Sequence, residues 1–103
     1  PWTVAKGFDQ SAPIGKFLPK TNFSDFRDIS FHLELNGNIV QNGNSGLMIY
    51  DFNDIIVHIS KFMTLRTGDY IFTGTPAGVG PVKVGDKLDG WIGPEKLLSC
   101  LIK

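Results

Sequence analysis

Two stretches of the sequence combine residue types that could bind a carbonyl group or a carboxylic acid. The first is centred on Lys6, whose apolar neighbours are Trp2, Val4, Ala5 and Phe8. A lysine in apolar company can be held against a carbonyl or enolate oxygen, and its pKa falls when it is buried. The alternative interpretation is an ordinary surface lysine, which composition alone favours.

The second stretch is a glycine- and proline-rich loop at residues 73–81, directly after an apolar run. It does not match a phosphate-binding loop, because no Gly-Lys-Ser/Thr follows and no Gly-x-Gly-x-x-Gly spacing is met. Gly74 and Thr75 instead offer a hydroxyl and backbone N–H groups that could face a ligand carboxylate. The alternative is a structural turn, which composition alone favours.

Metal-binding and nucleophile patterns are absent from the sequence. The two histidines lie far apart, Cys100 is the single cysteine, and no serine stands in a Gly-x-Ser-x-Gly elbow. His32 falls on the polar side of an alternating run, which predicts a solvated side chain. His58 falls near the edge of an apolar helical stripe, which predicts a packed or half-exposed side chain. A single cysteine forms no internal disulfide and fits a reducing compartment.

A β-hairpin is predicted around Asn36 and Gly37. Residues 31–35 alternate between apolar and polar types, which is the period of a half-buried strand, and a second extended run follows at residues 38–41. An Asn-Gly pair between two such runs favours a type I′ turn, because both central residues of that turn need a positive φ.

A helix is predicted over residues 52–65, where apolar residues recur at helical spacing. Asp51 precedes the run as an N-cap, and Asp54 adds negative charge to the first turn. Further strands are expected at residues 70–73, 87–92 and 97–102. The elements together predict a mixed α/β fold that is mostly β, with one helix.

Composition excludes several classes of protein. The chain has 103 residues and 11.3 kDa, with ten basic and ten acidic residues and a pI near 7.3, so no basic excess points to nucleic acid. No apolar stretch reaches the roughly 20 residues that span a membrane. The sequence begins at Pro1 without methionine or a signal peptide, and we expect it to be a fragment of a longer chain.

Taken in order, these motifs resemble the fumarylacetoacetate hydrolase superfamily. The resemblance rests on the Ala-Lys-Gly-Phe-Asp entry at residues 5–9, Asn36-Gly37 with Gln41, Gly68-Asp69, the loop at residues 73–81, and Gly85-Asp86. The entry and the loop are most similar to the branch of acylpyruvases, oxaloacetate decarboxylases and oxaloacetate tautomerases.

The resemblance implies a β-roll with short helices like the superfamily's C-terminal domain, incomplete in this chain. Residues 1–103 would be the C-terminal portion of a single catalytic domain. It also implies a homodimer, a Mg²⁺ or Mn²⁺ cofactor, and small β-dicarbonyl acids as substrates, namely acylpyruvates, fumarylpyruvate or oxaloacetate. The metal would chelate the 2-oxo acid and stabilise the developing enolate during cleavage of a carbon–carbon bond.

Carried over by position, the resemblance assigns roles to three residues. Lys6 would act in catalysis by donating to the substrate carbonyl or enolate. The hydroxyl and amide of Thr75 would hold the substrate carboxylate, and Gly74 would let the ligand approach the backbone closely.

The family's metal-binding carboxylates and its His-Glu pair would lie upstream of Pro1, so we expect no metal ligand in this chain and no activity from it alone. Three readings remain open: a hydrolase or lyase, an oxaloacetate keto–enol tautomerase, and a non-catalytic β-rich binding module. The expected partners are the small 2-oxo acid, the missing N-terminal half and a second copy, with no nucleic acid and no membrane. The expected location is the cytoplasm, or the mitochondrion in a eukaryote.

Overall fold

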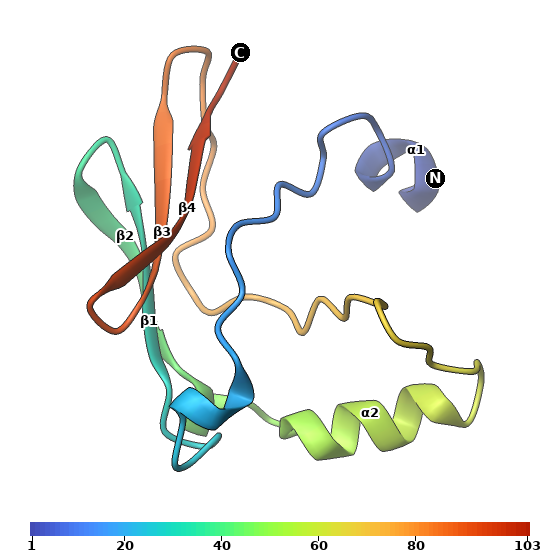
Figure 1. The fold of residues 1–103 in the computed structure, drawn as a ribbon. Helices are drawn as coiled ribbons and strands as arrows, with labels where there is room; N and C mark the ends of the chain where they lie inside the picture. The colour runs from blue at the N-terminus through green and yellow to red at the C-terminus, as the bar shows by residue number, and fades with distance from the viewer.

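The computed structural model describes residues 1–103, apart from the side chain of Trp2. Four strands form one antiparallel sheet in the order β2-β1-β3-β4 (Figure 1). They are β1 (Ser30–Leu35), β2 (Asn38–Asn44), β3 (Lys87–Ile92) and β4 (Glu95–Leu101). Outside the sheet lie the helices α1 (Trp2–Lys6) and α2 (Phe52–Ser60) and two single 3-10 turns, Lys20–Asn22 and Ser45–Leu47. The predicted mixed, mostly β fold is confirmed.

The predicted hairpin joins β1 to β2. Asn36 and Gly37 have φ values of 50° and 84°, so both central residues of the turn are left-handed, as a type I′ turn requires. The second hairpin, β3 to β4, begins its return strand at Glu95, two residues before the predicted start.

A polar clamp between Asn36 and Asp86 joins the two hairpins. The amide nitrogen Nδ2 of Asn36 donates to Oδ1 of Asp86 at 2.9 Å, and Oδ1 of Asn36 accepts from the backbone N–H of Lys87 at 2.9 Å. Asp86 is buried, and its second oxygen accepts from the backbone N–H of Lys83 at 2.9 Å. These bonds fix the turn of the first hairpin against the start of β3, and so set which residues of β1 and β3 lie opposite each other.

The register gives the sheet two different faces. Leu33 lies opposite Gly90 on one side and Gln41 on the other, and these residues share a face with Phe31 and Ile92. The opposite face carries the residues that alternate with them: His32, Glu34, Asp89 and Trp91. One face is therefore largely apolar and the other largely polar.

An N-terminal arm, residues 13–18, docks on the edge strand β4. Leu97 has no opposite residue in the register and forms a β-bulge, and its carbonyl accepts from the backbone N–H of Lys16 at 2.8 Å. A Cβ atom on Gly15 would collide with the same carbonyl. The bulge thus turns an edge carbonyl toward the arm, and the glycine lets the arm approach it.

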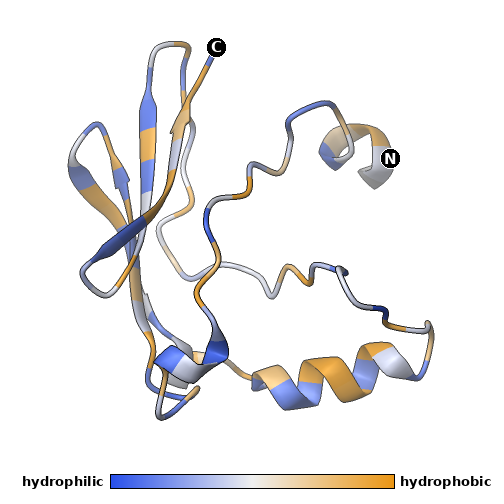
Figure 2. Ribbon diagram, viewed as in Figure 1, coloured by the Kyte–Doolittle hydropathy of each residue, from blue (hydrophilic) through white to orange (hydrophobic). Residues whose placement is uncertain are grey.

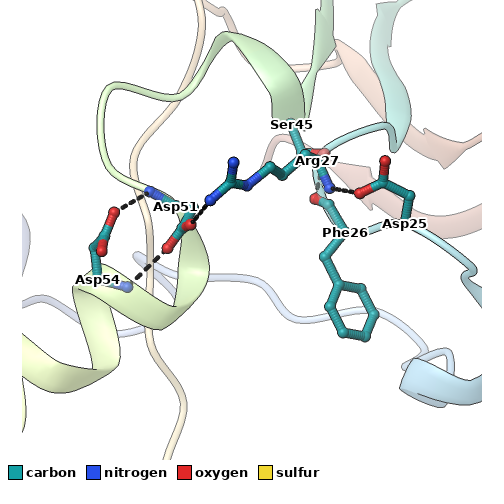
Figure 3. A network of polar contacts seen from close by, with 6 residues as sticks. All are labelled: Asp25, Phe26, Arg27, Ser45, Asp51 and Asp54. Atoms are coloured by element: carbon teal, nitrogen blue, oxygen red, sulfur yellow. Dashed lines mark hydrogen bonds and ion pairs between the residues drawn. The ribbon is translucent and has the colours of Figure 1, made fainter.

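Helix α2 begins where the sequence predicts. Oδ1 of Asp51 accepts from the backbone N–H of Asp54 at 2.8 Å, and Oδ2 of Asp54 accepts from the backbone N–H of Asp51 at 3.2 Å (Figure 3). Arg27 donates to Oδ2 of Asp51 at 2.7 Å. The bond from the Asp54 backbone and the bond from Arg27 both lower the pKa of Asp51. A charged capping box therefore fixes the start of α2 to the segment before β1.

The predicted end of the helix is wrong, because α2 stops at Ser60 rather than at residue 65. Beyond Ser60 the N–H groups of Lys61 and Phe62 bond to carbonyls three residues back, which tightens the chain into a turn. Phe62 and Met63 are exposed, so no packing holds a further helical turn.

The predicted strand at residues 70–73 is also wrong, since these residues pair with no strand of the described chain. The segment lies beside the N-terminal arm instead, and the rings of Phe17 and Tyr70 stack with centroids 5.2 Å apart. A strand needs a neighbouring backbone to pair with, and residues 70–73 lie against the arm rather than along the open side of either edge strand, β2 or β4.

The apolar face of the fold is open. No apolar side chain is fully buried among the described residues, and α2 stands away from the sheet with apolar residues along its length (Figure 2). The radius of gyration is 14.9 Å, against about 13 Å for a compact domain of this length. The accessible surface is 8461 Å², about one and a half times what a compact protein of this mass exposes. No described helix has the length and hydrophobicity to cross a membrane.

Replacing Asn36 by alanine should destabilise the intact protein by about 2 kcal/mol, because the change removes two hydrogen bonds and places alanine at a left-handed position. Urea unfolding measures the loss. The matched control is Asn38→Ala, at the first residue of β2 and outside the clamp. This change should alter the unfolding free energy little. Equal effects at both positions would contradict the clamp.

The clamp also predicts an acid-sensitive contribution to stability. The hydrogen bond from Asn36, followed by that from the Lys83 backbone, lowers the pKa of Asp86. A lowered pKa in the folded state means that the stabilisation is complete above the unfolded pKa of about 4 and is lost as the pH falls through the folded pKa. Asp86→Asn should therefore flatten the acid limb of the stability–pH curve, whereas the exposed control Asp9→Asn should leave that limb as steep as in the wild type.

Candidate active site

The loop at residues 73–81 docks on the edge strand β2 at a second bulge. Val40 has no opposite residue in the register of β1 and β2. Gly78 lies against this bulge with φ of 106°, and a Cβ atom there would collide with the Val40 carbonyl. The glycine is therefore needed twice, for its left-handed backbone and for its close approach to β2.

The side-chain amide of Gln41 ties the same loop to β2. Its Nε2 atom donates to Oγ1 of Thr75 at 2.8 Å and to the backbone carbonyl of Pro76 at 2.9 Å. Pro76 in turn lies over Gly43, where an added Cβ would come within 3.2 Å of the proline ring. These contacts fix the position of Thr75 relative to the sheet.

Gly74 turns the chain just before Thr75. Its φ is 96°, a conformation that L side chains rarely adopt. No described atom lies within 4 Å of the position that a Cβ would take at Gly74. The backbone at Gly74 and Thr75 therefore has open space on one side.

Gly74 and Thr75 also line a cavity of about 600 Å³, a volume typical of small-molecule sites. Thr73, Gly74, Thr75 and Pro76 line one side with Gln41, and the apolar face of the sheet lines another with Phe31, Leu33, Ile92 and Leu98. A mostly apolar wall with a few polar groups can orient a small ligand by its polar end. Gly74 and Thr75, both predicted from the sequence as ligand-binding residues, line the same cavity.

Lys6 does not line this cavity in the structure. It ends α1, a helix of five residues, which Figure 1 shows apart from the sheet. Val4 and Phe8 beside it are largely exposed. The structure therefore brings Gly74, Thr75 and Gln41 together and leaves Lys6 outside the cavity that they line.

The prediction of a solvated His32 is wrong. Its ring stacks on the indole of Trp91, with centroids 5.6 Å apart and planes 10° apart, and its Nε2 lies 3.4 Å from Oε1 of Glu34. The side chain is 23% exposed because the cross-strand neighbour in register is a large aromatic residue. His58 is exposed and lies against the ring of Phe62. His32 lies on the face of the sheet opposite Gln41.

The described residues do not fit a divalent metal ion by themselves. Among them, no three His, Cys, Asp or Glu side chains gather closely enough to hold one. The oxygens of Asp51 are taken up by Arg27 and the start of α2, and those of Asp86 by the clamp. A hard cation needs several free oxygen ligands at one point.

Gln41 belongs to one of the motifs that carry the family resemblance, but the sequence alone predicts no role for it. Its position in β2 carried a signal, because the register puts it opposite Leu33 on the otherwise apolar face of the sheet. A polar side chain on such a face needs a hydrogen-bond partner, and the partner is the loop that carries Thr75.

Comparison with known proteins identifies the family. Residues 1–101 match the family model described as fumarylacetoacetate (FAA) hydrolase C-terminal. Over 85 residues the chain is 48% identical to the mitochondrial oxaloacetate decarboxylase of Dictyostelium discoideum, covering 82% of this chain and 39% of that protein. Over 92 residues it is 45% identical to the mitochondrial oxaloacetate tautomerase FAHD1 of Bos taurus, covering 89% and 42%.

Solved structures share the fold. A Yersinia pestis CO92 protein assigned to the fumarylacetoacetate hydrolase family gives a TM-score of 0.91 at 41% identity, over 100% of this chain and 47% of that one. The maleylpyruvate hydrolase of Sphingobium sp. SYK-6, solved with manganese(II) and pyruvate, gives 0.77 at 30% identity, over 84% and 33%.

The chain spans about two fifths of the length of the curated relatives it matches. Sheet, helices and loop together have the architecture of the family's C-terminal region, and the structural match extends over the whole chain. The resemblance inferred from the motifs is confirmed: the chain belongs to the fumarylacetoacetate hydrolase family.

Proposed function

We propose that residues 1–103 are the C-terminal portion of one catalytic domain that cleaves a carbon–carbon bond in small β-dicarbonyl acids. Acylpyruvates, fumarylpyruvate and oxaloacetate are the proposed substrates. The observation that carries the proposal is that Gly74 and Thr75 line a cavity whose wall is mostly apolar. The oxaloacetate decarboxylase and tautomerase among its relatives support the substrate class.

In this proposal Thr75 and Gly74 bind the carboxylate of the substrate. The Thr75 hydroxyl donates a hydrogen bond to it, and the backbone N–H groups at the left-handed turn of Gly74 add further donors. The apolar wall of the sheet excludes water from the carbon chain of the acid, which strengthens these hydrogen bonds.

Lys6 is the proposed catalytic residue. Its ammonium group would donate to the substrate carbonyl and stabilise the enolate that develops when the bond breaks. This role requires α1 to lie against the cavity in the intact enzyme, which the exposed Val4 and Phe8 of the same segment favour, because they would then be covered.

The proposed cofactor is Mg²⁺ or Mn²⁺, with ligands from outside these 103 residues. The support comes from the maleylpyruvate hydrolase of Sphingobium, whose structure contains manganese.

The second candidate function is oxaloacetate keto–enol tautomerisation. It needs the same carboxylate binding and enolate stabilisation, but no activated water. It is favoured by the similarity to the tautomerase of Bos taurus.

A non-catalytic binding module is the third candidate. It is disfavoured because a module without catalytic activity would not need both Lys6 and the Thr75 loop. For the location, we propose the cytoplasm or the mitochondrion; the relatives from Dictyostelium and Bos taurus are mitochondrial by name.

Lys6→Met and Thr75→Val should each lower turnover by the intact enzyme by about 100-fold or more, because each removes a hydrogen-bond donor to developing or fixed negative charge. Steady-state kinetics measures the loss. The matched controls are Lys20→Met and Thr64→Val, at exposed positions away from the cavity. Unchanged turnover in both site variants would favour the binding module.

Two assays on the same intact preparation separate the candidate reactions: cleavage of acetylpyruvate, and exchange between the keto and enol forms of oxaloacetate. Each is run with and without EDTA. We expect cleavage to be abolished by EDTA and restored by Mg²⁺ or Mn²⁺. Rapid tautomer exchange without cleavage would instead select the tautomerase.

We also propose that the open apolar surface is covered in the intact enzyme by the rest of the catalytic domain and by a second copy in a homodimer. The exposed area is about one and a half times that of a compact protein, and many large apolar side chains are exposed within it. Large contiguous apolar surfaces mark interaction sites.

Residues 1–103 expressed alone should therefore self-associate or aggregate, whereas the intact protein should sediment as a stable dimer. Sedimentation velocity measures both. If residues 1–103 sediment as a folded, stable monomer, the open surface needs no cover and this part of the proposal is wrong.

A further inference from the structure

The orientation of the Gln41 amide is fixed by its contact with Pro76. A backbone carbonyl only accepts hydrogen bonds, so the atom 2.9 Å from the Pro76 oxygen must be the amide nitrogen. The same nitrogen lies 2.8 Å from Oγ1 of Thr75. Its two hydrogens are thereby used, one on the carbonyl and one on the hydroxyl.

This arrangement decides what Thr75 can do. A hydroxyl has one proton to donate and two lone pairs that accept. Because Oγ1 of Thr75 accepts from Gln41, the hydroxyl proton must point away from the amide, toward another acceptor. Thr75 and Gln41 both line the cavity, so a ligand there meets Thr75 as a donor.

We infer that Gln41 is a positioning residue that fixes the Thr75 hydroxyl as a hydrogen-bond donor, and thereby makes the site select a carboxylate over a neutral carboxamide. A carboxylate oxygen accepts this proton. A carboxamide offers a neutral carbonyl oxygen in its place, and a hydrogen bond to a neutral acceptor is about half as strong as one to a charged acceptor. The inference rests on the proposed function, because it takes the ligand to be a 2-oxo acid.

Pyruvate and pyruvamide are the probes, since they differ in the charged group alone. The dissociation constant of each is measured by calorimetry on the intact protein, and the ratio of the two is the readout. The ratio within one variant cancels any general loss of folded protein. Wild type should bind pyruvate more tightly, and Gln41→Leu should lower the selectivity by about 10-fold, the size expected for one hydrogen bond to a charged group.

The action of Gln41 through Thr75 is tested by the double variant. In the Thr75→Val background, Gln41→Leu should change the selectivity no further. The single variant Thr75→Ser, which keeps the hydroxyl, should retain the wild-type selectivity. The control is Asn42→Leu, an exposed residue next to Gln41 whose side chain lies on the other face of the sheet.

Two results would overturn the inference. If Gln41→Leu keeps the wild-type selectivity, the amide does not orient the hydroxyl. If Gln41→Leu lowers the selectivity equally with and without Thr75, the amide acts on the ligand directly or on the fold as a whole. If the wild type binds neither probe, the proposed function and this inference are both wrong. If the wild type binds pyruvate but Gln41→Leu keeps the selectivity, only this inference is wrong.

Discussion

The hydrogen bonds of the Asn36 side chain with Asp86 and with the backbone of Lys87 fix the register between the two hairpins, and the rest of the structure depends on that register. They join the turn of the first hairpin to the residue before β3, and the carbonyl of Asp86 accepts from the N–H of Ile102 beyond β4. A slip of one residue would move every side chain of a strand to the other face. Leu33 and Gln41 would then no longer share a face with Gly90 and Ile92, and the Thr75 loop would be anchored on the other side of the second hairpin.

Both edge strands hold a covering segment in the same way. A bulge leaves one residue without an opposite partner, Val40 in β2 and Leu97 in β4, and a glycine of the incoming segment approaches its carbonyl. The arm and the loop are thus positioned by backbone geometry at two points, in a chain whose described residues include no fully buried apolar side chain. The cavity lies between these two segments and the apolar face, so its shape follows from the bulges.

The features that the sequence predicted correctly are those that a few neighbouring residues determine. The Asn36-Gly37 turn and the Asp51 cap depend on residues within three positions of each other, and β3 was predicted with its observed bounds. The motif resemblance also identified the family, because it combined residues from distant parts of the chain.

The features that were predicted wrongly depend on partners distant in the sequence. Residues 70–73 have strand-forming side chains, but they lie against the N-terminal arm rather than along an edge strand of the sheet. Helix α2 ends early because Phe62 is exposed and its described ring contact is with His58 of the same helix, and His32 is half-buried because Trp91 lies opposite it. Gln41 acquired its role from the fold of the loop at residues 73–81, which no local pattern predicts.

The central claim is that the Thr75 loop binds the carboxylate of a small 2-oxo acid. A crystal structure of the intact protein with pyruvate tests it most directly. We expect a carboxylate oxygen within hydrogen-bond distance of Oγ1 of Thr75, with the Gln41 amide still bonded to Thr75 and Pro76. Pyruvate bound elsewhere, with the loop at residues 73–81 free of ligand, would contradict the account.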